Sequence, residues 1–401
     1  MEILQKIYEI TAFGQLAEDP SSLLLIGLAV LLLYLGIFKK YEPLLLVPIG
    51  FGVLLANFPG GHMDVVSTQV NPEIKHLNLI EIAESYGIMN MLYYALIKTG
   101  LLPPLIFMGV GAMTDFGPLL RNLRLAFFGA AAQLGIFTVL IGAILVGFTP
   151  QEAGALGIIG GADGPTAIYT AIILAPHLLG PIAIAAYSYM ALVPVIIPLV
   201  VKFTTTKKEL KINMRAQEKK YPSTYVIKNI KLVKILFPIA LVIVVSLLVP
   251  SSTPLVGMLL FGNLIKEIGS ETNRLFEAAS NTIMNSATIF LGLTVGATMT
   301  SATFLNVQTL MIILGGFIAF AFSIFGGIMA VKIYNIFSKK KINPLIGATG
   351  LSAVPMASRV ANEIALKHDA SNHILQYAMS SNISGVIGSA VAAGILISFL
   401  G

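Results

Sequence analysis

The sequence predicts an all-α, polytopic membrane protein made of two inverted repeats, each with about five transmembrane helices and one re-entrant hairpin. Composition is the first reason: 56% of the 401 residues are hydrophobic and 11% are charged, against about 25% charged residues in a typical soluble domain. The other reasons are a series of long apolar segments and a weak internal repeat. The segments do not alternate apolar and polar residues, so helices rather than a β-barrel are expected to fill the bilayer.

Apolar segments follow one another along most of the chain, and basic residues mark several of their ends. In chain order the segments are 22–38, 43–58, 101–120, 126–148, 153–175, 181–201, 235–249, 254–265, 282–300, 310–331, 344–358 and 374–400. The basic clusters are Lys39 and Lys40, Arg121 and Arg124, the stretch 202–234, and Lys339 to Lys341. Because cytoplasmic loops carry an excess of Lys and Arg, we expect all these clusters in the cytoplasm.

Two of the segments are predicted to enter and leave the membrane on the same side. Three apolar segments lie between Arg124 and Lys202, yet both residues are expected in the cytoplasm, so one segment must turn back. Segment 153–175 contains Gly-Gly-Ala-Asp-Gly-Pro, which cannot continue a regular helix. The same argument after Lys341 makes 344–358 a second hairpin. The chain would then cross the membrane about ten times.

Internal similarity supports two related halves. VGAMTDFGPLLRN (Val110–Asn122) resembles VGATMTSATFLN (Val295–Asn306), and PLLLVPIGFGVLLAN (Pro43–Asn57) weakly resembles PLVGMLLFGN (Pro254–Asn263). One constant offset aligns GIIGGADGP with GATGLSAVP and pairs Gly157 with Gly347, Gly160 with Gly350 and Pro165 with Pro355. An odd number of crossings per half inverts the second half, which is the plan of many secondary transporters. The hairpins then enter from opposite sides, and their tips should meet near the bilayer midplane.

These arguments divide the chain into four parts. Residues 1–20 form an amino-terminal interfacial segment, because they lack the basic start and apolar core of a cleaved signal. Residues 21–201 form the first membrane repeat, 202–234 a basic cytoplasmic linker, and 235–401 the second, inverted repeat. Within the first repeat, 59–100 is expected to be an acidic external excursion. The linker is interpreted as a solvated anchor in preference to a docking surface for a soluble partner.

The strongest candidate for chemistry is Asp163, in the turn of the first hairpin. Between Arg124 and Lys202 the only acidic side chains are Glu152 and Asp163, and a carboxylate inside an apolar span is costly. Hard cations such as sodium prefer oxygen ligands. The two hairpins offer that set in Asp163, Thr166, Asn343, Thr349 and Ser352, together with backbone carbonyls. A structural carboxylate that caps a half-helix is the weaker alternative for Asp163.

Other polar residues have less distinctive contexts. Arg359 follows the second hairpin, where a guanidinium suits a carboxylate or carbamate, although a topology anchor is equally plausible. Tyr187 and Tyr189 lie on a crossing that should flank the first hairpin, where a phenol can donate to an anion but more often packs. Asp115 and Glu152 are better explained as helix caps.

Several classes of function are disfavoured. The chain has no cysteine and therefore no thiolate metal site or Cys nucleophile. It contains no HExxH, GxxxxGK[ST] or GxSxG motif, so it has no recognisable ATP-driven motor. Its net charge of +6 comes from clusters at helix ends without interleaved aromatic residues, so nucleic acid is not an expected partner.

Four blocks of the sequence carry a family resemblance. GIIGGADGPTAIYTA, YSYMALVP, LGLTVGATM and NPLIGATGLSAVPMASRVAN are similar to the beta subunit of the sodium-pumping biotin-dependent decarboxylases, which act on oxaloacetate, methylmalonyl-CoA or glutaconyl-CoA. The similarity runs from about Leu101 to Gly401, with GGADGPT and NPLIG…SAVP…R the most specific blocks.

The resemblance implies roles for individual residues. The family's essential aspartate falls on Asp163, its tyrosine on Tyr189, and the polar set of the later block on Asn343, Gly347, Ser352 and Arg359. It implies that Asp163, Asn343 and Ser352 bind sodium and that Arg359 binds carboxybiotin. It also implies that Arg359, Asp163 and Tyr189 are catalytic and that Gly347 has a structural role.

The resemblance also implies partners and a setting. The cofactors would be sodium and a biotin that is carried by a partner and not attached to this chain. The partners would be a soluble carboxyltransferase subunit, a biotin carrier protein or domain, a small single-span membrane subunit and further copies of this chain, all at the cell (inner) membrane. Decarboxylation of carboxybiotin would drive sodium export and consume a proton. The alternative is a stand-alone sodium-coupled transporter or sodium/proton antiporter with no biotin chemistry, built on the same hairpins.

Overall fold

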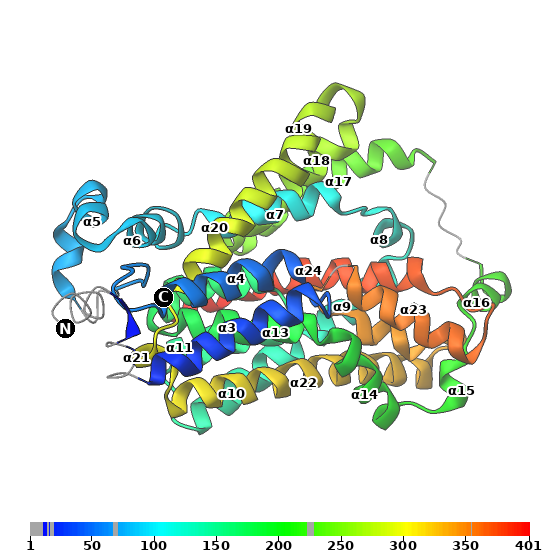
Figure 1. Ribbon diagram of the computed structural model, residues 1–401. Helices are drawn as coiled ribbons and strands as arrows, with labels where there is room; N and C mark the ends of the chain where they lie inside the picture. The colour runs from blue at the N-terminus through cyan, green and yellow to red at the C-terminus, as the bar shows by residue number, and fades with distance from the viewer. Residues whose placement is uncertain (1–10, 14–15, 17–19, 67–70, 223–227, 354) are drawn as a thin grey trace, which may run out of the picture.

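The computed structural model describes residues 11–13, 16, 20–66, 71–222, 228–353 and 355–401, and every regular element within these ranges is helical (Figure 1). The predicted interfacial segment 1–20 lies mostly outside the described residues. The all-α class predicted from composition and apolar segments is confirmed for the described part of the chain.

The helices up to the linker are α3 (Ser21–Ile37), α4 (Pro43–Ala56), α5 (Leu79–Tyr86), α6 (Ile88–Leu92), α7 (Leu102–Met113), α8 (Gly117–Arg121), α9 (Leu123–Ala132), α10 (Leu134–Leu145), α11 (Pro150–Gly157), α12 (Gly164–Leu174), α13 (Leu179–Ala191) and α14 (Val193–Thr204). The later helices are α15 (Lys207–Leu210), α16 (Met214–Lys220), α17 (Ile230–Leu248), α18 (Thr253–Ile268), α19 (Asn273–Glu277), α20 (Met284–Ala297), α21 (Ser301–Phe304), α22 (Val307–Phe337), α23 (Met356–His368) and α24 (Leu375–Leu400). The 3₁₀ segments are Pro72–His76, Ile158–Gly161 (η3), Pro176–Leu178, Pro250–Ser252, Ser270–Thr272 and Pro344–Thr349 (η8), and the π-helical segments are Tyr93–Ile97 and Ala278–Ile283.

Several helices have the length and composition of membrane spans. Among the described residues, four stretches qualify alone: Leu123–Leu145, Ile230–Leu248, Val307–Phe337 and Leu375–Leu400. Up to six qualify if two pairs, each bent by more than 40°, count as one span each: Ile88–Ile97 with Leu102–Met113, and Pro176–Met190 with Val193–Thr204. The other segments predicted to cross hold shorter helices, α3, α4, α18 and α20. The chain is thus a helical membrane protein, and about ten crossings stays a prediction.

The stretch 59–100, predicted to be an external excursion, is partly helical in its described residues. It contains α5 and α6, and the helix from Ile88 to Ile97 joins α7 through a bend of 64°. Helical structure therefore begins well before the apolar segment that the sequence places at Leu101. The bend falls at Gly100, whose positive φ of 71° is a conformation that favours glycine.

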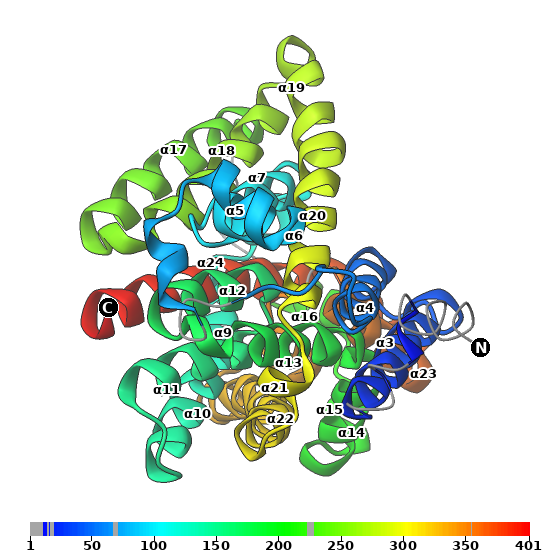
Figure 2. The same cartoon turned by 60° about the vertical axis from the view of Figure 1, so that its left-hand side comes forward.

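The helices of the two halves interleave. α4 packs on α20, and α18 packs on α7. α9, α10 and α13 pack around α22, and α9 also lies along α24. Figures 1 and 2 show α17, α18, α19 and α20 rising to one side of this longer bundle. The buried centre of the bundle therefore combines helices from both halves.

Two asparagines join the halves in a reciprocal way. Asn57, after α4, donates to the carbonyl of Met299 at 2.7 Å, and Asn263, in α18, donates to the carbonyl of Thr114 at 2.7 Å. Thr114 and Met299 each stand four residues after the valine that opens their copy of the VGA repeat, and both asparagines end the weaker PL…N repeat. Both side chains are buried. This exchange of equivalent bonds favours the internal repeat that the sequence indicates.

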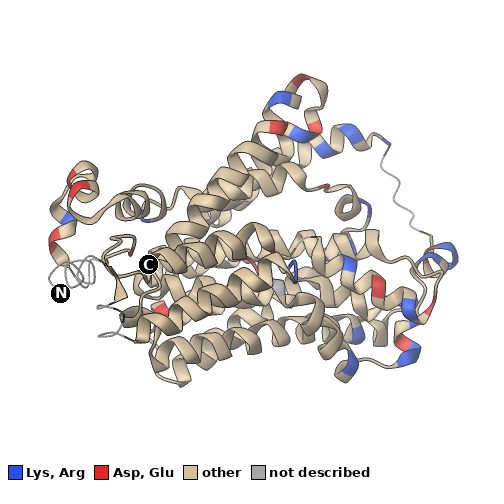
Figure 3. Cartoon of the chain, in the orientation of Figure 1, with Lys and Arg blue, Asp and Glu red and all other residues tan. Residues whose placement is uncertain are grey.

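The linker helices fold back onto the second half. Lys332 Nζ lies 3.1 Å from Glu209 Oε1, and Asn213 donates to Asp369 Oδ2 at 3.1 Å. Lys340 donates to the carbonyl of Tyr221 at 3.0 Å. Most Lys and Arg residues gather at the end of the molecule away from the two termini (Figure 3), which fits a single basic, cytoplasmic side.

Candidate functional site

The turn around Asp163 is built by local sequence chemistry. α11 ends at Gly157, η3 follows, and Ala162 takes the left-handed conformation with φ of 55°. Asp163 is extended and caps α12, its Oδ1 accepting from the backbone N–H of Thr166 at 3.1 Å. Pro165 lies in the first turn of α12, where its missing N–H costs nothing. The carboxylate is therefore held at the start of a helix, pointing inward and only 4% exposed.

The two ends of this segment lie together. Glu152, in the first turn of α11, has its Oε1 at 2.8 Å from Nε2 of His177, which follows α12. Gln308 of α22 donates to the same oxygen at 3.2 Å. α11 also packs along α12. The chain thus reverses direction around Asp163, and α11 and α12 lie side by side.

The segment around Ser352 also has its two ends together. Asn343, just before η8, and Asn372, after α23, both donate to the carbonyl of Ile212, each at 3.0 Å. Between them the chain passes through η8, Ser352 and α23. The chain between these two asparagines therefore includes the whole of α23, which ends at His368.

The two turns are in direct contact. The N–H of Ser352 donates to the carbonyl of Gly161 at 3.0 Å, as the predicted approach of the tips requires. Ser389 of α24 completes the contact: its Oγ donates to Asp163 Oδ2 at 2.8 Å and lies 2.8 Å from Ser352 Oγ. Either hydroxyl can be the donor between Ser352 and Ser389. A hydroxyl chain therefore runs from Ser352 to Asp163.

Three more oxygens near this carboxylate lack a partner. Among the described residues, Gln133 Oε1, Thr166 Oγ1 and the Tyr187 hydroxyl are buried without a hydrogen bond. Thr166 is in the first turn of α12, and the ring of Tyr187 lies against Gly164, where a Cβ would come within 2.0 Å of it. Gln133 breaks the helix between α9 and α10 and lies against the backbone of Gly161. Unsatisfied buried oxygens are rare and call for an ion or water.

No basic side chain pairs with Asp163 within the described part of the chain. A buried carboxylate without a counter-charge is unfavourable unless it binds a cation or a proton. The groups around it are carboxylate, hydroxyl and amide oxygens, the ligand types that hard cations prefer. The arrangement is suited chemically to bind a small cation reversibly.

The other residues singled out in the sequence lie apart from this cluster. Tyr189 bonds to the carbonyl of Ile313 on α22, and its ring packs on Phe317 and Phe320. Asn343 uses its amide on the linker, at the carbonyls of Leu210 and Ile212.

Gly347 and Arg359 lie on either side of the Ser352 turn. Gly347 meets Gly327 of α22 so closely that a Cβ on Gly347 would lie 2.0 Å from the Gly327 carbonyl oxygen. Arg359, in the first turn of α23, is exposed, and its side chain makes no ion pair with another described residue. Of the predicted site residues, the structure therefore brings together Asp163 and Ser352.

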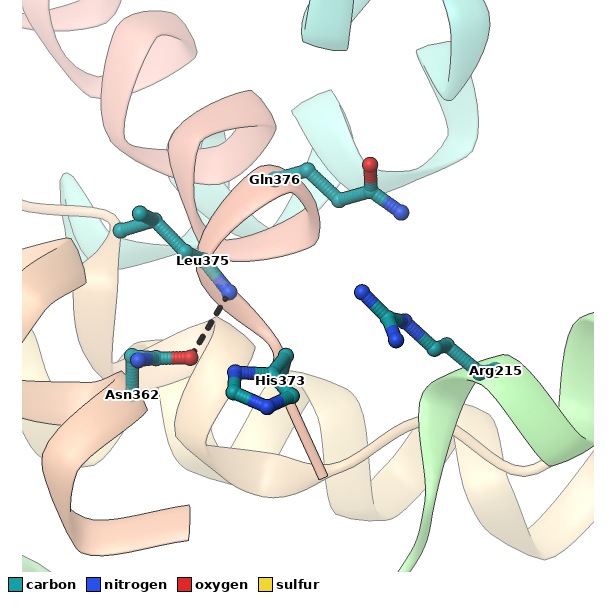
Figure 4. Close-up of a pocket in the computed structure, with 5 residues that line it drawn as sticks. All are labelled: Arg215, Asn362, His373, Leu375 and Gln376. Atoms are coloured by element: carbon teal, nitrogen blue, oxygen red, sulfur yellow. Dashed lines mark hydrogen bonds between the residues drawn. The ribbon is translucent and has the colours of Figure 1, made fainter. Parts of the chain in front are cut away.

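A pocket of about 360 Å³ lies between α16, α23 and the start of α24 (Figure 4). Asn362 Oδ1 in its wall accepts from the backbone N–H of Leu375 at 3.2 Å. Arg215 points into the open space opposite His373 and below Gln376. Arg215 supplies the guanidinium group in the lining of this pocket.

Comparison with known proteins identifies the family. A family model described as the Na+-transporting oxaloacetate decarboxylase beta subunit matches residues 21–400. The chain belongs to this family. It is 47% identical over 411 residues to the methylmalonyl-CoA decarboxylase subunit beta of Propionigenium modestum, covering 100% of both chains. It is 43% identical over 445 residues to the oxaloacetate decarboxylase beta chain of Klebsiella pneumoniae, covering 100% of this chain and 99% of the other.

A third relative, the methylmalonyl-CoA decarboxylase subunit beta of Veillonella parvula, is 46% identical over 392 residues, or 96% of this chain and 95% of its own. The resemblance drawn from the four sequence blocks is thereby confirmed, and it extends over the first hundred residues, which carry the weakest motifs. The chain is a Na+-transporting decarboxylase beta subunit by family.

The sequence argument missed Ser389 and Gln133 as members of the cluster. One signal for Ser389 exists: Asn382 and Ser389 stand seven residues apart on α24, so they share a helix face. Asn382 bonds to the carbonyl of Leu351 and Ser389 to Ser352, so both contact the same turn. Polar residues two turns apart in an apolar helix indicate such a contact, although not its partner.

Proposed function

We propose that this chain is the membrane subunit of a decarboxylase complex and that it decarboxylates carboxybiotin while exporting sodium. The observation that carries the proposal is family membership at 43–47% identity over 96–100% of the chain. In this proposal a soluble carboxyltransferase subunit and a biotin carrier deliver the substrate, and a small single-span membrane subunit completes the complex. Further copies of the chain assemble with it in the cell (inner) membrane.

Sodium, the transported ion, binds beside Asp163. The buried carboxylate with no basic partner supports this assignment, as do the adjoining Ser352 and the unpaired oxygens of Gln133, Thr166 and Tyr187. Asn343 is a predicted ligand for a state in which the linker has moved, because its amide now bonds to the carbonyls of Leu210 and Ile212.

Arg359 receives the carboxyl group of the substrate. Its exposure and lack of an ion pair support this role, because a free guanidinium can donate two parallel hydrogen bonds to a carboxylate. Carboxybiotin supplies the carboxyl group that leaves as carbon dioxide when the ring nitrogen takes up a proton. Arg359 orients that carboxyl group at the mouth of the second hairpin, and Tyr189 helps to hold α13 against α22 beside the site.

Sodium export requires the site to open to each side in turn. The proposed device is a pair of inverted repeats, 21–201 and 235–401, with re-entrant hairpins around 153–175 and 344–358 and the linker 202–234 between them. The reciprocal bonds of Asn57 and Asn263 support the repeat, and the bond between Ser352 and Gly161 supports opposed hairpin tips. Movement of the bundle that carries both turns would change access to Asp163.

The test is sodium-dependent release of carbon dioxide from the chain purified with its carboxyltransferase and biotin carrier. Release should require sodium, and avidin should abolish sodium uptake into inverted vesicles. A stand-alone sodium carrier, the alternative, would move sodium at full rate without partners. Sodium uptake unaffected by avidin would therefore overturn the proposal.

A further inference from the structure

A second, larger cavity of about 570 Å³ lies between the turn from α8 to α9, the linker and the end of α22. Its lining includes the four basic residues Arg121, Arg124, Lys339 and Lys340, and one carboxylate, Glu218. The lining is therefore strongly cationic. We propose that this cavity binds the headgroup of an anionic phospholipid from the cytoplasmic leaflet.

Most of the positive charge in the cavity is unpaired. Lys340 donates to the carbonyl of Tyr221 at 3.0 Å, and Glu218 accepts from the hydroxyl of Tyr377. Within the described residues, Arg121, Arg124 and Lys339 make no side-chain hydrogen bond or ion pair. Three cationic side chains are thus free to contact a phosphate, while the single carboxylate is directed to a tyrosine.

The cavity lies at the ends of two candidate membrane spans. The two helices that flank it belong to the spans Leu123–Leu145 and Val307–Phe337; Arg121, Lys339 and Lys340 lie just outside these spans, and Arg124 is the second residue of the first span. The inner leaflet carries anionic lipids and attracts Lys and Arg near the surface by about 1 kcal/mol each. A ligand in this cavity would therefore lie where phospholipid phosphates are found.

The surface below the cavity is apolar and open to the membrane. On α9, Leu123 is 57% and Phe127 is 67% exposed, and on α22, Ile333 is 56% and Phe337 is 86% exposed. α9 and α22 pack against each other, and both carry exposed apolar side chains near the cavity. Free phosphate needs only the basic residues, whereas the acyl chains of a lipid would also cover exposed apolar side chains. The basic lining and the neighbouring apolar side chains together favour a lipid over a soluble anion.

The walls of the cavity are ordered by packing. Tyr377 is 2% exposed, and Tyr334 packs edge-on against Phe128 with ring centres 5.6 Å apart. Tyrosines are enriched at membrane interfaces because one end of the ring is apolar and the other polar. The lipid site is independent of the decarboxylation chemistry, since it shares no residue with the Asp163 cluster or with Arg359.

The test measures binding of short-chain phosphatidylglycerol to the purified full chain in detergent, beside phosphatidylcholine of the same chain length. Arg124→Gln with Lys339→Gln should weaken phosphatidylglycerol binding about 30-fold, from roughly a fivefold loss per charge. The matched control is Lys207→Gln with Lys208→Gln, which removes two exposed charges from α15 outside the cavity and should change binding less than about twofold. Phosphatidylcholine should bind at least about tenfold more weakly than phosphatidylglycerol.

Further binding measurements distinguish a lipid phosphate from a soluble phosphate. Glycerol 3-phosphate and inorganic phosphate should bind far more weakly than phosphatidylglycerol, and equal affinity would mean a soluble anion and overturn the lipid proposal. Unchanged lipid binding in the double variant would also overturn the lipid proposal. If that variant instead lost a soluble protein partner while binding lipid normally, the cavity would be a protein-binding site. If the double variant does not fold, Lys339→Gln alone should still weaken binding about fivefold.

Discussion

The two reversed segments have similar turns but carry opposite chemistry. By the offset that aligns their glycines, the position of Asp163 in the first segment corresponds to Ala353 in the second. The returning helix α12 is almost wholly buried, whereas α23 exposes Arg359 in its first turn. One segment therefore places a carboxylate at the centre of the protein, and the other leads from an exposed cation to a buried hydroxyl at Ser352.

The segments also differ in how their ends are held. Glu152 and His177 close the first with an ionisable contact, while Asn343 and Asn372 tie the second to the linker with neutral amides. The first contact depends on the charge of Glu152, whereas the amide contacts of the second involve no charged group. Each difference can be tested by a substitution in one segment with a matched change elsewhere.

The largest effect is expected from Asp163→Asn. The variant should insert normally and lose sodium-dependent carbon dioxide release by at least roughly 100-fold, since breaking a buried charge interaction costs about 3 kcal/mol or more. The control, Glu152→Gln, removes the other carboxylate between Arg124 and Lys202 and should retain most activity. An active Asp163→Asn enzyme with ordinary sodium dependence would contradict the central assignment.

Arg359→Ala tests the exposed end of the second segment. We expect the concentration of carboxylated carrier needed for half-maximal rate to rise roughly 30-fold, because truncating one side of a charged, hydrogen-bonded pair costs about 2 kcal/mol or more. The sodium requirement should change little. Lys367→Ala, an exposed cation in the last turn of the same helix, is the matched control. Equal losses in both variants would point to general charge and not to a carboxylate contact.

Ser389→Ala tests the contact between the two segments. It should raise the sodium concentration for half-maximal activity about tenfold, because a hydrogen bond to a charged group contributes about 1.5–3 kcal/mol. Ser384→Ala, on the same helix, removes a bond to the carbonyl of Ala126 and should leave the sodium requirement unchanged. If both variants shift sodium dependence alike, the hydroxyl chain to Asp163 has no special role.

Gly157 and Gly347 are aligned by the internal repeat, but the space for a Cβ atom differs between them. A Cβ on Gly347 would lie 2.0 Å from the Gly327 carbonyl oxygen, and one on Gly157 would lie 2.8 Å from the Ile136 carbonyl oxygen. Gly347→Ala should therefore reduce stability more than Gly157→Ala, by roughly 1 kcal/mol, as measured by thermal unfolding in detergent. Gly27→Ala, with no neighbour within 4 Å, is the control. The reverse order would show that the second segment adapts more easily.

The smallest effect concerns pH at the ends of the first segment. Burial raises the pKa of Glu152, but hydrogen bonds from His177 and Thr149 outweigh it, so the net pKa is lowered from 4.5. The lowered pKa means that Glu152 stabilises the fold above about pH 4.5 and loses this effect as pH falls through its own pKa. Glu152→Gln should remove about 0.5 kcal/mol of stability at neutral pH and flatten the acid dependence. If stability falls with decreasing pH in the variant as it does in the original protein, other groups cause the loss of stability in acid.

The sequence argument was strongest where local chemistry decides the conformation. Gly160, Asp163 and Pro165 predict a broken helix, and the structure has η3, a left-handed residue and a capped α12 in that place. The argument did not identify the helical stretch from Ile88 to Ile97, which joins α7 through a bend of 64°. The predicted hairpin 344–358 ends within α23, because the polar, amphipathic sequence of that helix does not indicate an apolar membrane segment.

Composition, apolar segments and motif blocks by themselves determined the helical membrane class, the family, and Asp163 as the buried carboxylate. Only the tertiary structure decided which side chains surround Asp163. Ser389 is far from it in sequence, and Gln133 and Tyr187 come from different helices. The physical reason is that a turn is fixed by neighbouring residues, whereas the oxygens around a buried charge are brought together by helix packing, which no single segment specifies.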